Sequence, residues 1–435
     1  MSQLDRKAVF GWSMYDWANS AFATTVMAGI LPVFFDKLWS TDVDPVVSLS
    51  RWGYANSLGG IIVAVMAPVL GAIADRGSAK KKFLIFFAFL GVLMTSALYL
   101  VAQGNWLLAL GLYVMGVIGF SGANIFYDSL LPSVAGDKKM DFVSALGYSL
   151  GYLGGGLLFA ANVWMVAKPE LFGFPDTSEA VRFAFVTVGI WWAVFSLPLI
   201  LFVKEPRFRA PEAGIGVIKG GIKQLKNTFQ EIRHLKTIFL FLIAYWLYID
   251  GVDTIIRMAT KYGDLIHLDP NFLIIALLIV QFVGFPAAIA FGWLGERIGA
   301  KRLIFFAIGV YLFVSAWAAF MDSEREFLVL AILIGLVQGG IQALSRSYYA
   351  RIIPVDKAAE YFGFYNMLGK FAVMIGPALI SSVGLGLKYL GLSDDTALRG
   401  GIASVSLLFL AGGIVLYFVD EEKGREEARY LSEVY

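Results

Sequence analysis

The chain has 435 residues, of which 58% are hydrophobic and only 16% are charged. Soluble proteins are about 45–50% apolar and about 25% charged, so this composition excludes a water-soluble globule and indicates a protein that crosses a membrane many times. The 35 Lys and Arg nearly balance the 33 Asp and Glu, which gives no basis for a nucleic-acid partner. The absence of cysteine excludes iron–sulfur clusters and thiolate zinc sites, and we expect no metal and no cofactor.

Twelve stretches are long and apolar enough to cross a bilayer, at about 20 residues each. In chain order they cover residues 9–35, 53–74, 83–102, 107–131, 142–167, 183–203, 237–260, 272–294, 303–321, 327–350, 361–386 and 400–419. Between the sixth and the seventh, the polar segment 204–236 has apolar residues at helical spacing, which predicts a linker with an amphipathic helix. The expected fold is an all-α polytopic membrane protein with six-helix bundles at 1–203 and 237–420 and a tail at 421–435.

The positions of Lys and Arg predict the orientation of the chain. Twenty-five of the 35 fall on the side of the N-terminus, eight fall on the opposite side and two lie within spans. Because positively charged loops stay in the cytoplasm, we expect both termini and the linker to be cytoplasmic. In a bacterium the host membrane would be the plasma or inner membrane.

Two loops at matching places in the two bundles share one pattern. The loops after the second and the eighth spans begin Gly71-Ala-Ile-Ala-Asp75-Arg76-Gly77 and Gly292-Trp-Leu-Gly-Glu296-Arg297-Ile-Gly299. An acid and an Arg at a helix end, before a glycine turn and a basic cluster, can bond to nearby helix ends and latch the bundles together. The pattern resembles the Gly-x-x-x-Asp-Arg-x-Gly-Arg-Arg loop of the major facilitator superfamily. That resemblance implies two pseudo-symmetric six-helix bundles that rock around a central site.

A narrower resemblance rests on strings in the first and tenth spans. They read Tyr15-Asp16-Trp17-Ala18-Asn19-Ser20 and Gln338-Gly-Gly-Ile-Gln342-Ala-Leu-Ser345-Arg346. Both resemble the vacuole-effluxer branch of the superfamily, which is typified by autophagy-related exporters of amino acids from fungal vacuoles. The resemblance implies export of an amino acid, although the bacterial relatives have no assigned substrate and need not share that cargo.

Six ionisable residues lie within the predicted spans, with Arg346 at the cytoplasmic end of the tenth span counted with the adjoining loop. They are Asp16, Asp128, Asp250, Asp253, Arg257 and Lys370. Each costs at least about 2.5–3.5 kcal/mol near the centre of a bilayer, so each should face a partner or a wet cavity. They are therefore candidates for a substrate and proton pathway, with a buried structural ion pair as the alternative for each. Their excess of two acids supplies the protonatable group that a proton-coupled carrier needs.

The first and seventh spans can be overlaid so that Asp16 matches Asp250 and Asn19 matches Asp253. In the superfamily these spans line the cavity, and Asp16 or Asp250 is our expected proton carrier. Asp250, Asp253 and Arg257 also share one helix face, so a local salt bridge is an equal alternative to substrate contact.

The fourth and tenth spans carry a second set of polar residues on single stripes, comprising Tyr127 and Asp128 and, on the tenth, Gln338, Gln342 and Arg346. Asp128 and Arg346 lie near the cytoplasmic helix ends, which favours a gate or latch as much as cargo binding. Lys370 precedes a Gly-Pro pair, where its charge would meet a carboxylate of the cargo or one of the aspartates.

The function that these features favour is alternating-access transport of a small polar solute. Mixed charges, amides and aromatic residues suit an amino acid or another zwitterion, moved in exchange for protons or driven by them, with export favoured and a monomer expected. A lipid scramblase or a receptor with a carrier fold stays open as an alternative. A membrane-embedded enzyme or an ATP-driven pump is disfavoured, because the chain has no nucleotide-binding, metallohydrolase or nucleophile-elbow motif.

The fifth span carries Gly147, Gly151 and Gly155 at four-residue spacing. Small residues at this spacing let two helices approach closely, so we predict a tight helix contact along this stripe.

Overall fold

The computed structural model describes residues 5–41, 43–205, 220, 223, 225–228, 235–265 and 270–434. Within these ranges the chain is almost entirely helical and forms no strand. Eleven helices in the described part are long and apolar enough to cross a membrane. The all-α, multi-pass fold expected from composition is therefore confirmed, whereas the amphipathic helix expected in the linker lies mostly outside the described residues.

The N-terminal half contains the elements of the first six predicted spans. They are α1 (Arg6–Ala21), the π-helix η1 (Phe22–Gly29), α2 (Ile30–Leu38), α3 (Pro45–Gly77), α4 (Lys80–Ala97), α5 (Trp106–Ala167) and α6 (Thr177–Phe202). The C-terminal half contains α8 (Lys236–Leu265), α9 (Pro270–Ile298), α10 (Ala300–Ala318), α11 (Glu324–Ile352), α12 (Ala358–Tyr389), α13 (Asp394–Ser404), α14 (Ser406–Tyr417) and α15 (Glu421–Val434).

Helix α5 accounts for the difference between twelve predicted spans and eleven apolar helices. It has 62 residues, and at 1.5 Å per residue a straight helix of that length would extend about 93 Å, three times the hydrocarbon thickness of a bilayer. Gly136 interrupts it with φ 60° and ψ 167°, a conformation that suits glycine. The first leg, 106–135, contains the fourth predicted span and the second leg, 137–167, contains the fifth. The count of twelve passes stays a prediction.

The second leg of α5 packs tightly on α1 and η1 along its glycines. A Cβ at Gly147 would lie 2.5 Å from Asp16 Oδ2, and one at Gly151 would lie 2.5 Å from Ser20 Oγ. At Gly155 the nearest atom would be Thr24 Oγ1, at 2.7 Å. The close contact predicted from the glycine stripe is confirmed, and it brings the backbone of α5 directly against Asp16.

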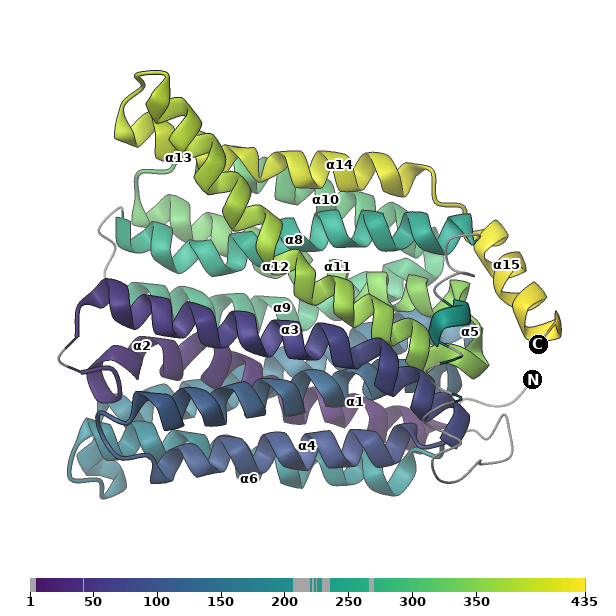
Figure 1. The fold of residues 1–435 in the computed structure, drawn as a ribbon, viewed down its shortest axis with the longest axis horizontal. Coiled ribbons are helices and arrows are strands. Elements are labelled where there is room, and N and C mark those ends of the chain that lie inside the picture. The colour runs from purple at the N-terminus through teal and green to yellow at the C-terminus, as the bar shows by residue number, and fades with distance from the viewer. Residues whose placement is uncertain are drawn as a thin grey trace.

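The two halves touch along two seams, one between α3 and α12 and one between α5 and α9, and the contacts change along the length of the helices. Figure 1 shows the end where α1 begins and α15 lies on the right, here called the α15 end, and α13 at the opposite end, the α13 end. Near the α15 end α3 and α12 touch, because a Cβ at Gly363 would collide with the backbone of Ala67 and Pro68. Toward the α13 end α12 diverges from α3 (Figure 1).

Helices α5 and α9 are in contact both near the α15 end and further along toward the α13 end. Close to the α15 end a Cβ at Gly292 of α9 would collide with Ala145 of α5. Further along, Gly156 packs against Gln281, whose Nε2 donates to Thr24 Oγ1 of η1 at 2.8 Å. Among the described residues, the halves therefore touch at two places along the α5–α9 seam, whereas along the α3–α12 seam the helices touch near the α15 end and diverge toward the α13 end.

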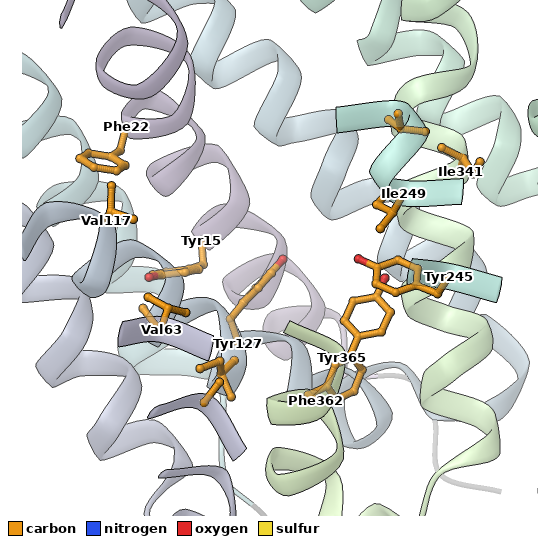
Figure 2. Packing of buried hydrophobic residues seen from close by; sticks show 14 of the residues in the cluster. Tyr15, Phe22, Val63, Val117, Tyr127, Tyr245, Ile249, Ile341, Phe362 and Tyr365 are labelled. Atoms are coloured by element: carbon orange, nitrogen blue, oxygen red, sulfur yellow. The ribbon is translucent and has the colours of Figure 1, made fainter. Parts of the chain in front are cut away.

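Buried aromatic and aliphatic side chains of both halves belong to one hydrophobic cluster. Figure 2 shows Tyr15, Phe22, Val63, Val117 and Tyr127 grouped on the N-terminal side and Tyr245, Ile249, Ile341, Phe362 and Tyr365 grouped on the C-terminal side. Tyr245 and Tyr365 stack with ring centroids 4.0 Å apart, which ties α8 to α12.

The glycine contact between α1 and α5 can be tested by overpacking it. Gly155→Leu should destabilise the protein by about 1–3 kcal/mol, because neither Thr24 nor the backbone of Ser20 can withdraw. Gly111→Leu on the first leg of α5 is the matched control, since nothing lies within 4 Å of a Cβ there. Thermal unfolding in detergent should show a lower apparent melting temperature for Gly155→Leu only, and an equal loss in both variants would contradict the tight contact.

Candidate functional site

The candidate site is centred on Arg346, a side chain of α11 that is only 2% exposed. Its Nη1 donates to Asp128 Oδ1 at 3.0 Å, and its Nη2 donates to Asp16 Oδ2 at 3.3 Å. Its Nε donates to Ser144 Oγ at 2.9 Å, and Nη2 also donates to the Ser144 carbonyl at 2.8 Å. One guanidinium of the C-terminal half is thus held by α1 and by both legs of α5. We call Arg346, Asp16, Asp128, Tyr127 and Ser144 the Arg346 cluster.

The two carboxylates of the cluster have further partners. Tyr127 donates its hydroxyl to Asp16 Oδ2 at 2.7 Å. Asn366 of α12 donates to Asp128 Oδ2 at 3.4 Å, so a second helix of the C-terminal half reaches the same carboxylate. Asp16 and Asp128 are 8% and 7% exposed, so water screens these bonds little.

Aromatic rings surround the guanidinium. Its central carbon lies 4.4 Å from the ring of Tyr148, 4.8 Å from that of Trp12 and 5.3 Å from that of Tyr127. Trp12 stacks on Tyr127 at 4.3 Å and donates its Nε1 to the Tyr127 carbonyl. These rings attract the cation through their π-faces and hold it where the two carboxylates meet.

The chemistry of the cluster is that of a charge-pair lock between the halves. The N-terminal half supplies two acids and the C-terminal half supplies one cation. Separating the halves at this point would leave buried charges without partners, which is strongly unfavourable. A solute that carries both a carboxylate and an ammonium group could take the place of each partner.

The first predicted latch lies where α3 meets α12. Asp75 Oδ1 and Oδ2 accept the backbone N–H groups of Ala359 at 3.2 Å and Glu360 at 2.8 Å, at the N-terminus of α12. The Lys80 ammonium lies 2.8 Å from Asp75 Oδ1. A carboxylate at a helix N-terminus is favoured by the free N–H groups and by the helix dipole. Gly71 permits the approach, because a Cβ there would collide with Ala359, whereas Arg76 lies beside Gly220.

The second predicted latch lies where α9 meets the second leg of α5. Glu296 Oε2 is 2.7 Å from the Lys139 ammonium, which is 52% exposed. Gly292 lets α9 reach α5 beside Asp141 and Ala145. Arg297 stays on its own helix, with its guanidinium 3.6 Å from the Trp293 ring.

A buried ion pair that the sequence reasoning missed lies between these sites. Asp141 Oδ2 is 2.7 Å from Arg351 Nη2, and Ser347 Oγ donates to Asp141 Oδ1 at 2.5 Å. Asp141 is 1% exposed. Asp141 immediately precedes the predicted span 142–167 and Arg351 immediately follows the predicted span 327–350, so neither is among the in-span charges. The available signal was Ser347 and Arg351 at four-residue spacing on α11.

Among the described residues, no other predicted residue is a hydrogen-bond partner of Arg346. Asn19 donates to Asn124 at 2.6 Å, within the N-terminal half. Gln342 and Gln338 are half-buried on α11, one and two turns from Arg346. Asp253 is half-buried on α8, and Lys370 is half-buried on α12.

Asp250 and Arg257, two predicted residues of α8, differ in how much of them the structure describes. Asp250 bonds to Thr254 and Gly376, away from Arg346. Arg257 lies in α8, but its side chain is outside the described set. Within the described residues no group of three or more His, Asp or Glu side chains is placed to hold a metal ion.

Comparison with known proteins agrees with this architecture. A family model described as "Vacuole effluxer Atg22 like" matches residues 45–429. An uncharacterized MFS-type transporter of Bacillus subtilis, YxiO, is 38% identical over 413 residues, which are 94% of each chain. Autophagy-related protein 22 of Saccharomyces cerevisiae is 27% identical over 88% of this chain and 80% of the yeast protein.

Solved structures of the superfamily share the fold. The proton:xylose symporter XylE superposes with a TM-score of 0.71 at 13% identity, covering 98% of this chain and 97% of that one. A bacterial homologue of the iron transporter ferroportin, solved in an outward-facing state, gives a TM-score of 0.67 at 14% identity, covering 96% and 99%.

The latch geometry predicts unequal effects of removing its two acids. Asp75→Asn should raise the labelling rate of a cysteine placed at Ala358 about tenfold or more, because a buried charge-assisted hydrogen bond contributes about 1.5–3 kcal/mol. Ala358 is fully buried, and the chain has no other cysteine. Glu296→Gln breaks an ion pair with an exposed lysine and should change the rate only slightly. Equal effects of the two variants would show that the buried cap does not hold this end closed.

Proposed function

Because the chain belongs to the vacuole effluxer Atg22-like family of the major facilitator superfamily, we propose that it carries an amino acid or a similar zwitterion by alternating access. The observation that carries this proposal is the Arg346 cluster, in which one buried cation of one half meets two buried acids of the other. The solute's carboxylate pairs with Arg346, and its ammonium group pairs with Asp16 and Asp128.

The cost of unpaired charge explains how such a cargo permits the conformational change. When the halves part at the α15 end, Arg346 moves with α11 and the two aspartates stay with α1 and α5. Without cargo, both sides keep charges in a medium of low dielectric, at several kcal/mol per ion. A zwitterion supplies one compensating charge to each side, so it lowers the barrier selectively for the loaded carrier.

We further propose that transport is coupled to protons and runs in the direction of export. With both acids ionised, the Arg346 cluster has one carboxylate more than it has cations, and Asp250 adds another carboxylate within the membrane. Asp16 and Asp250 are the candidates for the proton carrier. The family description names an effluxer, which supports export. The excess of Lys and Arg on the loops at the α15 end supports a cytoplasmic location for both termini and for that end.

Transport of the cargo can be measured with purified protein in proteoliposomes. A panel of labelled amino acids should contain at least one that the wild type accumulates. Arg346→Lys should reduce its uptake about tenfold or more, because a compact ammonium group cannot reproduce the four hydrogen bonds that the guanidinium makes from three nitrogens. The matched control is Arg325→Lys, an exposed position in the first turn of the same helix, which should transport normally. If no amino acid moves, or if both variants behave alike, the zwitterion proposal is wrong.

Proton coupling makes a separate prediction for the same vesicles. An imposed pH gradient should speed uptake of the transported amino acid, since movement of the solute in one direction is exchanged for protons in the other. A protonophore should remove the acceleration and leave the basal exchange unchanged. Uptake that ignores both the gradient and the protonophore would contradict proton coupling but not transport itself.

A further inference from the structure

Asp250 is a fully buried carboxylate of α8, and the part of the chain that the structure describes shows no ion pair to it. It is 0% exposed, and none of the ion pairs among the described residues includes it. Its Oδ1 accepts the Gly376 N–H of α12 at 3.0 Å and the Thr254 hydroxyl at 3.1 Å. Its Oδ2 is buried and has no hydrogen-bond partner. A buried carboxylate with one unoccupied oxygen is a place where a small cation can be bound.

The described groups around Asp250 are apolar, neutral or acidic, apart from Lys370 of α12. On α8 itself the nearest ionisable group is Asp253, one turn further on, which is also an acid. Helix α14 presents an apolar face, with Phe409 packed against Gly251 and stacked on Tyr311 of α10. Helix α11 contributes hydroxyls, since Ser345 bonds to Tyr248 at 2.7 Å. Helix α12 carries Lys370 six residues before Gly376, and that lysine has other interactions.

The N–H group that Asp250 accepts belongs to Gly376, at a position where a proline weakens the hydrogen bonding of α12. Pro377 lies inside this helix, where it has no N–H to donate and its ring crowds the preceding turn. Gly376 cannot carry a side chain there, because a Cβ would collide with Thr254 and approach Asp250. The bond from Gly376 to Asp250 therefore ties α12 to α8 at the residue before its proline.

Helix α12 also connects this point to the lock between the halves. Ten residues before Gly376, Asn366 bonds to Asp128 of the Arg346 cluster. Beyond Gly376 lies the part of α12 that diverges from α3 toward the α13 end (Figure 1). A change at Asp250 can therefore alter the angle between a segment fixed at the lock and a segment at the open seam.

We propose that Asp250 is the coupling-proton site of the carrier and that its protonation releases the bend of α12 at Gly376 and Pro377. The charged carboxylate accepts the Gly376 N–H in a charge-assisted bond, which holds the outer part of α12 away from α3. A proton added at Oδ2 removes the charge and weakens that bond. The outer part of α12 then swings toward α3 and closes the α13 end. This inference rests on proton-coupled transport as proposed above.

The test measures the opening of the α3–α12 seam without any solute. Cysteines at Tyr54 of α3 and Tyr389 of α12, which are 77% and 97% exposed, can carry spin labels because the chain has no cysteine of its own. In lipid nanodiscs, double electron–electron resonance should show shorter distances as the pH falls from mildly alkaline to mildly acidic. Asp250→Asn, which is neutral at every pH, should give the short distances throughout that range.

Two further variants distinguish a specific effect of the charge of Asp250 from a general folding defect. Thr254→Val removes a hydroxyl that favours the charged carboxylate, so the midpoint of the distance change should move to higher pH while its amplitude is retained. Asp36→Asn, which neutralises an exposed acid of α2, should leave the wild-type response unchanged. Elution as a monodisperse peak in size-exclusion chromatography checks each variant.

Several results would overturn the proposal. They are a wild type whose distances ignore pH, an Asp250→Asn variant that still responds like the wild type, a Thr254→Val midpoint that does not move, or a response that disappears when choline replaces sodium. Because no solute is present, the outcome is independent of the amino-acid panel. If the panel moves nothing while Asp250→Asn abolishes the pH response, the cargo assignment fails and the proton site stands.

Discussion

The cost of an unpaired charge inside a membrane is the constraint on which the rest of this structure depends. The charge of Arg346 cannot be buried without partners. Its guanidinium donates four hydrogen bonds to acceptors on α1 and on the two legs of α5. Those partners belong to the other half of the molecule. Closure at the α15 end and neutralisation of Arg346 are consequently one event, and any opening at that end needs a replacement for the partners that are lost.

The two seams are held by different contacts, although the two halves repeat one sequence pattern. Asp75 is buried and caps α12, whereas Glu296 reaches only an exposed lysine. The α5–α9 seam is nevertheless held further along its length, through Gly156, Gln281 and Thr24. The α3–α12 seam has its cap at one end and diverges beyond it. In the proposed alternating-access cycle, the α5–α9 seam is the pivot and the α3–α12 seam is the side that opens.

The parts that could be predicted from sequence are those that depend on local chemistry. Apolar runs identify the spans, the in-span charges Asp16 and Asp128 stand out because they are costly there, and Arg346 stands out as a gate or latch residue near a helix end. Their pairing could not be predicted, since the partners are more than 200 residues apart and meet only through helix packing. Asp141 was missed because it directly follows a polar, lysine-containing stretch that reads as loop. The π-helical segment Phe22–Gly29 lies in an apolar run, where the hydrophobic pattern does not distinguish one helical period from another.

Asp16 and Asp250 show how a repeated position can acquire two chemistries. The sequence overlay treats them as equivalents, but packing places Asp16 beside a guanidinium and a phenol and Asp250 beside a backbone N–H and a hydroxyl. Asp16 shares one guanidinium with Asp128, so protonation of Asp16 would cost part of a favourable ion pair. The partners of Asp250 among the described residues are neutral, so a proton there breaks no ion pair. In the proposed mechanism, the carboxylate at one of these positions helps to hold the halves together and the carboxylate at the other binds the coupling proton.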